Sequence, residues 1–168
     1  MKLYHVWYLI VKNPEIKYSD TKLDFGKGFY TTDIVSQANK WASVKALVNN
    51  VPYGFVTVYK PISLLDINKF NSLIFNDYNE DWLDFIIDSR NCIEHLEFDC
   101  ILGPLADSNT NKVISKYNRG LIDRKDLLNL LQFKTKTNQL CVNKQSICNK
   151  LFIYDYHYKV DLNGKVIK

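Results

Sequence analysis

Residues 24–33 read DFGKGFYTTD, and this stretch places Gly26 and Gly28 directly before the aromatic pair Phe29 and Tyr30. Glycine has no Cβ, so the main chain at these two positions can adopt positive φ or approach a flat or phosphorylated ligand closely. Tyr30 can add a ring face for stacking and a hydroxyl group for a hydrogen bond. The segment therefore predicts a loop whose backbone touches a planar ligand, with a plain structural turn as the alternative.

Three known motifs can be excluded for this segment. Asp24, Phe25 and Gly26 spell a kinase triplet, but the chain has no HRD loop and no lysine of the VAIK type. Gly26 and Gly28 begin a GxGxxG pattern, but Thr31 stands where the third glycine is needed. The GxxxxGK phosphate loop is absent from the sequence. We therefore expect neither a kinase nor a dinucleotide-binding or P-loop domain.

Length and composition indicate one domain over residues 1–168. The chain has 22 Lys and Arg residues against 18 Asp and Glu residues, a net charge of +4 that lies far from a dedicated nucleic-acid binder. No CxxC pair occurs, so we expect no metal site and small buried cysteines in a reducing cytoplasm. Neither a signal-peptide cleavage site nor an apolar run of about 18 residues occurs, so we expect no membrane partner.

Periodicity and turn residues predict a mixture of helices and strands. Strands are expected over residues 2–11, 54–59, 64–67, 98–103, 139–142 and 151–160, and helices over about 33–49, 80–90, 109–117 and 123–131. Thr32 or Asp33 is expected to cap the first helix, and Asp123 the last. The two types alternate too irregularly for a doubly wound parallel sheet, so the expected fold class is α+β.

The sequence FGKGFYTTD over residues 25–33 resembles the FGKGIYFAD stretch of poly(ADP-ribose) polymerase catalytic domains. Four ordered blocks, LDFGKGFYTT, EDWLDFIIDSRN, FDCILGPLADS and NQLCV, are also similar to uncharacterised bacterial proteins of the ADP-ribosyltransferase superfamily. Genes for those proteins often stand beside small regulators in a toxin-and-antitoxin arrangement. The resemblance covers residues 3–142 and implies a single-domain ADP-ribosyltransferase fold, with a split mixed β-sheet flanked by helices.

The resemblance implies NAD as co-substrate and assigns a pocket for it. The implied NAD-binding residues are His5, Val6, Gly28, Phe29, Tyr30, Thr31 and Trp41. His5 fits the histidine of the first core strand, although the family usually follows it with glycine, so Val6 offers only its backbone. Trp41 stands where the family has a second stacking tyrosine, and Ala38 where it has a serine. Without the resemblance, His5 on an apolar strand would be read as a core histidine.

The late strand departs from the family at its catalytic position. Gln139, in NQLCV, stands where these enzymes carry a glutamate, so it can accept a hydrogen bond but has no charge and cannot act as a base. The missing charge costs on the order of 2–4 kcal/mol of transition-state stabilisation. Our hypothesis is that Asp107 supplies the charge or activates the acceptor while Gln139 orients the ribose and Tyr30 holds the nicotinamide. A helix cap shared with Ser108 and Asn109 is the alternative for Asp107.

Two positively charged features also have two readings each. Arg90, at the end of the 80–90 helix, can reach an NAD phosphate or pair with Asp84 or Asp88. The lysines around the Gln139 strand form either a rim that attracts polyanions or a solvated face; they are Lys134, Lys136, Lys144 and Lys150.

The alternating aromatic residues of the tail are expected to share one face of a sheet; they are Phe152, Tyr154, Tyr156 and Tyr158.

The expected function is NAD-dependent transfer of one ADP-ribose unit to a macromolecule, protein or nucleic acid, by a bacterial toxin or effector. An antitoxin protein is a further expected partner. The alternative from another class is a catalytically silent NAD or ADP-ribose binding module on the same fold. An RNA-directed phosphate-removing transferase is a third possibility, which no basic cluster in the sequence favours.

Overall fold

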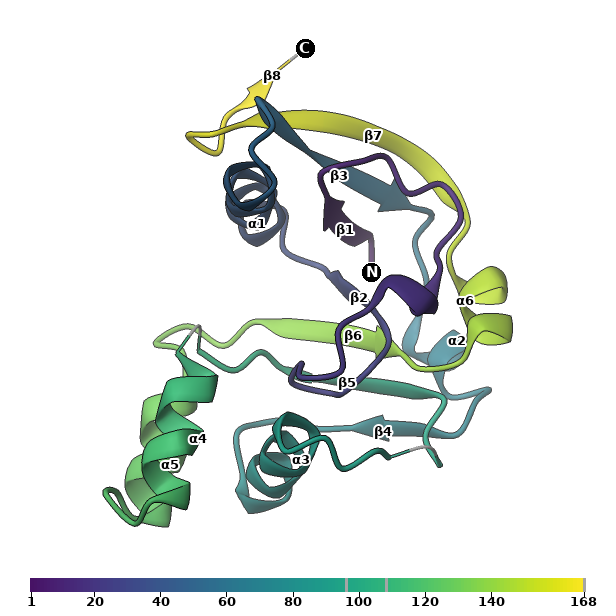
Figure 1. Cartoon of the computed structure of the whole chain (residues 1–168). Helices are drawn as coiled ribbons and strands as arrows, with labels where there is room; N and C mark the ends of the chain where they lie inside the picture. The colour runs from purple at the N-terminus through teal and green to yellow at the C-terminus, as the bar shows by residue number, and fades with distance from the viewer. Residues whose placement is uncertain (96, 108, 168) are drawn as a thin grey trace.

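The centre of the structure, a computed structural model, is a mixed β-sheet with helices on both faces (Figure 1). The structure describes residues 1–95, 97–107 and 109–167, which form one domain. Its fold class is α+β, as the sequence predicts. The strands are β1 (Leu3–Trp7), β2 (Phe29–Thr32), β3 (Tyr53–Tyr59), β4 (Ser72–Ile74), β5 (Cys100–Pro104), β6 (Asn138–Val142), β7 (Tyr154–Asp161) and β8 (Val166–Ile167). The helices are η1 (Ile16–Tyr18), α1 (Val35–Val48), α2 (Leu64–Ile67), α3 (Glu80–Arg90), α4 (Thr110–Asn118), α5 (Arg124–Leu131) and α6 (Gln145–Leu151).

The sheet has the strand order β4-β5-β6-β2-β1-β3-β7-β8, and β4 with β5 is the parallel pair of the described part. The glycine segment leads into β2. In this strand order β2 is a central strand, between β6 and β1. β1 pairs with β3 along its whole length, but with β2 only where Tyr4 faces Thr32. β1 and β2 consequently diverge beyond this pair. In Figure 1, β1, β3, β7 and α1 form the upper part, and β4, β5, β6 and α3 to α5 the lower part.

One face of the sheet carries α1 over β1 and β3, and α3 over β5 and β6. α1 lies close because its contact side consists of alanines, Ala38, Ala42 and Ala46, all fully buried. Gly54 of β3 is needed for this approach, since a Cβ there would lie 2.2 Å from the carbonyl oxygen of Ala42. α3 is anchored by Trp82, whose Nε1 donates to the carbonyl of Pro104 at 3.0 Å.

The opposite face carries a second core beneath α2, α6 and η1. Its buried residues include Leu3, Phe29, Tyr59, Ile67, Leu140, Val142, Leu151 and Phe152. Side chains alternate along β2, so Phe29 belongs to this core while Tyr30 packs on the α3 side. The two aromatic residues of the glycine segment are thus separated by the sheet.

Two predicted elements match the structure closely. The helix expected over residues 80–90 is α3, capped by Asn79, whose Oδ1 accepts from the backbone N–H of Trp82 at 2.8 Å. The helix expected from Asp123 is α5, and Asp123 caps it by accepting from the backbone N–H of Asp126 at 2.8 Å. The first prediction rests on the apolar face of residues 80–90, and the second on Asp123 as the cap that binds free N–H groups of the first helical turn.

Other predicted elements are corrected. Residues 64–67 form the helix α2 rather than a strand, because Ser63 and Asp66 cap each other's backbone N–H groups in a capping box. α1 begins at Val35, and the Thr32 hydroxyl accepts from the N–H of its N-cap residue, Ile34, at 3.2 Å. The first strand ends at Trp7, well before residue 11. The strands β4 and β8 were not predicted.

The C-terminal strand also differs from the prediction. Residues 145–151 form α6, and β7 begins only at Tyr154. A bulge opposite Val58 and Tyr59 shifts the register of β7, so that Tyr154 and Tyr156 face adjacent positions of β3 although they are two residues apart. The tail aromatics therefore do not share one face. None of the helices built from described residues has the length and apolarity needed to cross a membrane.

The contact between Gly54 and α1 leads to a stability prediction. Gly54→Ala forces a methyl group into the backbone of α1, so we expect the free energy of unfolding to fall by about 1–3 kcal/mol. Val44→Ala, on the exposed side of α1, is the control and should cost less than about 1 kcal/mol. Urea denaturation of the three proteins measures both values, and an unchanged stability of Gly54→Ala would contradict the close packing.

Candidate functional site

The divergence of β1 and β2 leaves a gap between two central strands, here called the β1–β2 gap, and His5 of β1 lies in it. The Nδ1 atom of His5 is 2.8 Å from the backbone carbonyl oxygen of Tyr30, and the imidazole stacks on Phe29 with ring centroids 4.1 Å apart. Because a carbonyl only accepts, Nδ1 carries the proton and Nε2 keeps a lone pair. His5 therefore connects the two strands where their backbones no longer pair.

The environment of His5 favours its neutral form. Burial lowers the pKa of His5 to about 4, the positive charge of Lys45 acts in the same direction, and the hydrogen bond to Tyr30 opposes both. A buried imidazole loses the hydration that stabilises its charged form. At neutral pH the ring is therefore a fixed hydrogen-bonding group rather than a cation.

One side of α1 borders the β1–β2 gap. Gln37, Trp41 and Lys45 lie one helical turn apart and so share a side of the helix. Gln37 Oε1 accepts from the Thr32 hydroxyl at 2.5 Å, and Lys45 Nζ lies 4.7 Å from the ring centroid of Trp7. Trp41 lies between these two anchored residues and is 39% exposed. Its indole is consequently available at the edge of the gap.

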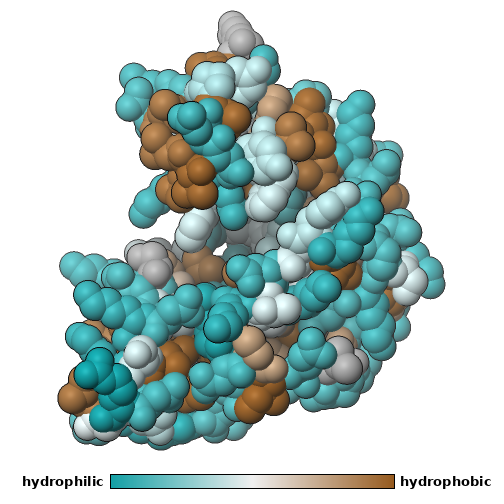
Figure 2. Space-filling view, viewed as in Figure 1, coloured by the Kyte–Doolittle hydropathy of each residue, from teal (hydrophilic) through white to brown (hydrophobic). Residues whose placement is uncertain are grey.

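Figure 2 shows a hollow in the molecular surface between the part over α1 and the part over α4 and α5. In the same view of Figure 1, β2 and β6 lie between these two parts. The hollow therefore opens at the level of the strands that carry Tyr30 and Gln139.

A buried polar network lies beside Gln139, centred on Asp24, which is 4% exposed. Asp24 Oδ1 forms an ion pair with Arg90, whose Nε donates to it at 3.2 Å. Asp24 Oδ2 accepts from the backbone N–H of Ala106 at 3.1 Å and from Nε2 of Gln139 at 2.8 Å. Both carboxylate oxygens are therefore engaged, and Gln139 itself is buried.

The guanidinium of Arg90 is held on three sides. Besides Asp24, its Nη1 donates to the carbonyl of Lys22 at 2.8 Å and to Oδ1 of Asn111 at 3.0 Å. The ion pair expected of Arg90 thus exists, but its partner is neither Asp84 nor Asp88. Asp84 pairs with Arg124, and Asp88 faces His95. Arg90 is the last residue of α3, so its side chain reaches the loop before β2 rather than the preceding helical turn.

The glycine segment is held mainly by contacts within the protein. The Tyr30 hydroxyl donates to the carbonyl of Gly26 at 2.6 Å and accepts from the N–H of Phe25 at 3.0 Å, and burial raises its pKa. Gly26 has φ +71°, the left-handed conformation that favours glycine. A Cβ on Gly28 would lie 2.3 Å from Sγ of Cys141. The glycines therefore serve a tight loop and a close approach to β6.

The remaining residues that the resemblance assigns to NAD lie on either side of the sheet. Val6 pairs with Val56 of β3 and packs in the core under α1. Thr31 is buried, and its hydroxyl donates to the carbonyl of Leu140. Ala38, at the position of the family's serine, is fully buried on the side of α1 that packs against the sheet.

Asp107 lies in the turn that leads into α4. Its carboxylate Oδ1 accepts from the backbone N–H of Asn109 at 3.1 Å, and its backbone N–H donates to the carbonyl of Leu131 at 2.9 Å. The N-cap residue of α4 is Asn109, which makes no side-chain cap hydrogen bond, and Asp107 binds the backbone of this residue. Ser108, the third residue of the expected cap, lies outside the described residues. Asp107 directly follows Ala106, so it adjoins the Asp24 network.

Sequence reasoning passes over Asp24 and Gln37, although both shape the site. Asp24 stands within the quoted segment, but nothing in the pattern pairs it with residues 66 and 115 positions away. An acidic residue between the apolar Leu23 and Phe25 is the available signal, because buried acids need partners. The described residues hold no group of three potential metal ligands, and their cysteines are free.

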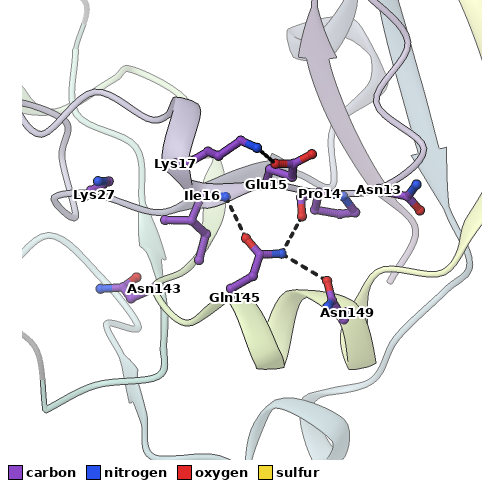
Figure 3. Close-up of a pocket in the computed structure, with 9 residues that line it drawn as sticks. All are labelled: Asn13, Pro14, Glu15, Ile16, Lys17, Lys27, Asn143, Gln145 and Asn149. Carbon is purple, nitrogen blue, oxygen red and sulfur yellow. Dashed lines mark hydrogen bonds and ion pairs between the residues drawn. The ribbon is translucent and has the colours of Figure 1, made fainter.

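A second hollow, with a volume of about 670 Å³, lies beside α6 (Figure 3). Gln145 crosses it: Oε1 accepts from the N–H of Ile16 at 3.0 Å, and Nε2 donates to the carbonyl of Pro14 at 2.6 Å and to Asn149 at 3.0 Å. Lys17 pairs with Glu15 at the rim. The polar groups here mainly tie the loop after β1 to α6.

The depressed pKa of His5 predicts sensitivity to acid. Above pH 6.5 the imidazole is neutral in both states; between 6.5 and about 4 it takes up a proton only when the chain unfolds. The wild-type protein should therefore lose on the order of 2–3 kcal/mol more stability than His5→Gln between pH 7 and pH 4. Urea denaturation at a series of pH values measures this, and parallel curves for the two proteins would contradict it.

A family model described as a protein of unknown function, DUF3990, matches residues 1–152. The match includes the β1–β2 gap and the Asp24 network and ends before β7. No curated protein and no solved structure matches the chain significantly. Because the match spans most of the 168 residues, the chain belongs to the DUF3990 family.

Proposed function

We propose that the protein is an NAD-dependent mono-ADP-ribosyltransferase that modifies a macromolecule. The observation that carries the proposal is the order of the central strands, β6-β2-β1. His5, Tyr30 and Gln139, which the resemblance assigns to one site although they lie far apart in the sequence, are on these three adjacent strands. Residues that serve one ligand must be neighbours in space, and these strands are neighbours, although the His5 ring stacks on Phe29, on the face of the sheet opposite to Tyr30.

In this proposal NAD binds at the β1–β2 gap with its nicotinamide near α1. The exposed indole of Trp41 stacks on the nicotinamide ring, and the backbone of Val6 binds its amide. Because Nδ1 of His5 is used by the Tyr30 carbonyl, Nε2 is the atom that can accept a hydrogen bond from a ribose hydroxyl. Tyr30 contributes mainly by holding the glycine segment, since its hydroxyl is bound to Gly26 and Phe25.

The reaction breaks the bond between the nicotinamide nitrogen and the anomeric carbon of the ribose. Nicotinamide leaves with the bonding electron pair, positive charge develops on the sugar, and a nucleophile of the acceptor forms the new bond and loses its proton. Gln139 accepts a hydrogen bond from the ribose, and Asp107 supplies negative charge or takes the acceptor's proton. Since Gln139 replaces the carboxylate used for chain elongation, a single ADP-ribose unit is transferred.

The biological setting follows from the resemblance alone. It is that of a cytoplasmic bacterial toxin or effector whose acceptor is a protein or a nucleic acid and whose activity an antitoxin protein restrains. Growth arrest on expression, relieved by a neighbouring gene product, tests this setting. Mass spectrometry of the modified molecule then identifies the acceptor.

One observation favours a second function, that of an NAD-binding module without turnover. Gln139 is uncharged and buried, and its amide nitrogen is bound to Asp24. Such a site can hold the ribose without stabilising a cationic transition state. Incubation with NAD labelled in the nicotinamide separates the two functions, because only the enzyme releases the label.

Trp41 provides a test of NAD binding that spares the fold. Trp41→Ala removes a stacking surface from an exposed position, so the Kd for NAD should rise by up to about tenfold. The matched control is Val44→Ala, one turn along the same helix and similarly exposed, which should leave the Kd unchanged. Isothermal titration calorimetry measures both, and equal affinities of the two variants would contradict a nicotinamide stacked on Trp41.

A further inference from the structure

The hydrogen bond between Asp24 and Gln139 fixes the direction of the Gln139 amide. An ionised carboxylate has no proton and can only accept, so the atom 2.8 Å from Asp24 Oδ2 is the nitrogen Nε2. The carbonyl oxygen Oε1 of Gln139 then points away from Asp24. Within the described part of the chain Oε1 has no hydrogen-bond partner, and it is not among the buried polar atoms that lack one. Water, or a ligand, can therefore reach Oε1.

Asp24 is itself held too firmly to adjust. Arg90 binds one carboxylate oxygen, and the backbone N–H of Ala106 shares the other with Gln139. Its contacts thus come from the end of α3, the loop after β5, and β6. A carboxylate held at both oxygens keeps its plane and its acceptor positions, so the amide bound to it has one preferred direction.

Asp24 cannot reach a substrate, because it is buried and both of its oxygens are occupied. We propose that Asp24 is a positioning residue for ADP-ribose transfer: it turns the Gln139 amide so that Oε1, and not the NH₂ group, faces the ribose. This inference rests on the proposed function. A ribose hydroxyl donates to Oε1, whereas an NH₂ group turned toward the sugar would place positive partial charge where a cation develops.

Asp24→Asn tests the proposal because asparagine is both a donor and an acceptor. The amide of Gln139 can then bind Asn at position 24 through either of its ends, and its direction is no longer fixed. We expect kcat for nicotinamide release to fall about tenfold or more, with the KM for NAD within about threefold of the wild-type value. A loss of fold alone would instead lower the active fraction, which thermal denaturation detects.

Asp99→Asn is the matched control. Asp99 is also a largely buried carboxylate with a cationic partner, Lys144, at 2.5 Å, and it accepts from the backbone N–H of Asn71 at 3.1 Å. It has no contact with Gln139. Its replacement should lower the melting temperature while leaving kcat unchanged.

An exchange of the two side-chain types provides a rescue. In Asp24→Asn combined with Gln139→Glu, the NH₂ group at position 24 donates to the carboxylate at position 139, and the second carboxylate oxygen faces the ribose. The Ala106 N–H loses its acceptor in this variant, which lowers stability but leaves the direction of the side chain at position 139 fixed. This double variant should recover kcat to at least the wild-type value. Gln139→Glu alone places two carboxylates in contact, so it should be less stable and slower than the double variant.

The outcomes separate this inference from the proposed function. A wild-type protein that neither binds NAD nor releases nicotinamide overturns the proposed function, and the role of Asp24 with it. An active wild type whose Asp24→Asn variant has the same kcat as Asp99→Asn overturns the positioning role alone. If Asp24→Asn does not fold, the double variant decides: a kcat above that of Gln139→Glu supports the positioning role, and an equal kcat overturns it.

Discussion

The ion pair between Asp24 and Arg90 is the interaction on which the central part of the molecule depends. It joins the loop before β2 to the end of α3, and through Gln139 and Ala106 it extends to β6 and to the loop after β5. Removing one partner of such a buried pair costs about 3–5 kcal/mol, because the other charge is left without compensation. The glycine segment keeps its place over the sheet because this pair holds its first residue.

Hydrogen bonds within the glycine segment distinguish it from a loop that closes on a ligand. The Tyr30 hydroxyl binds the backbones of Phe25 and Gly26, so these hydrogen bonds hold the segment from within. In the proposed function, NAD instead meets Trp41 on α1 and the gap that His5 occupies. A glycine segment held by its own hydrogen bonds, beside an exposed indole, is the arrangement expected of a site organised before binding.

Local signals in the sequence predicted a good part of the fold. Asp123 caps the helix that follows it, as expected, and the amphipathic run of residues 80–90 matches α3. The failures have physical causes of longer range. Residues 64–67 suit a strand by composition, but the capping box of Ser63 makes them helical. The three-residue strand β4 pairs with β5, a partner almost thirty positions away that its own sequence does not reveal.

The candidate site was likewise predicted only in part from the sequence. The resemblance selects His5, Tyr30 and Gln139, and the strand order places them on neighbouring strands. The choice of partner for Arg90 was beyond sequence reasoning, since Asp24 lies 66 positions away in the chain. Asp84 and Asp88 are six and two residues before Arg90 on the same helix, so neither faces it. Side-chain alternation adds a further restriction: Phe29 and Tyr30 are adjacent residues, yet the sheet assigns them to different cores.

The pairing of β7 with β3 has a consequence for the edge of the sheet. β7 begins after the segment that matches the family and covers β3 along its whole length, from Tyr53 to Tyr59. Without it, β3 would present a row of unpaired backbone groups beside aromatic and branched side chains, a surface that invites strand addition from another chain. β7 thus covers this edge of β3, and β8 in turn pairs with β7 at Lys159 and Val160.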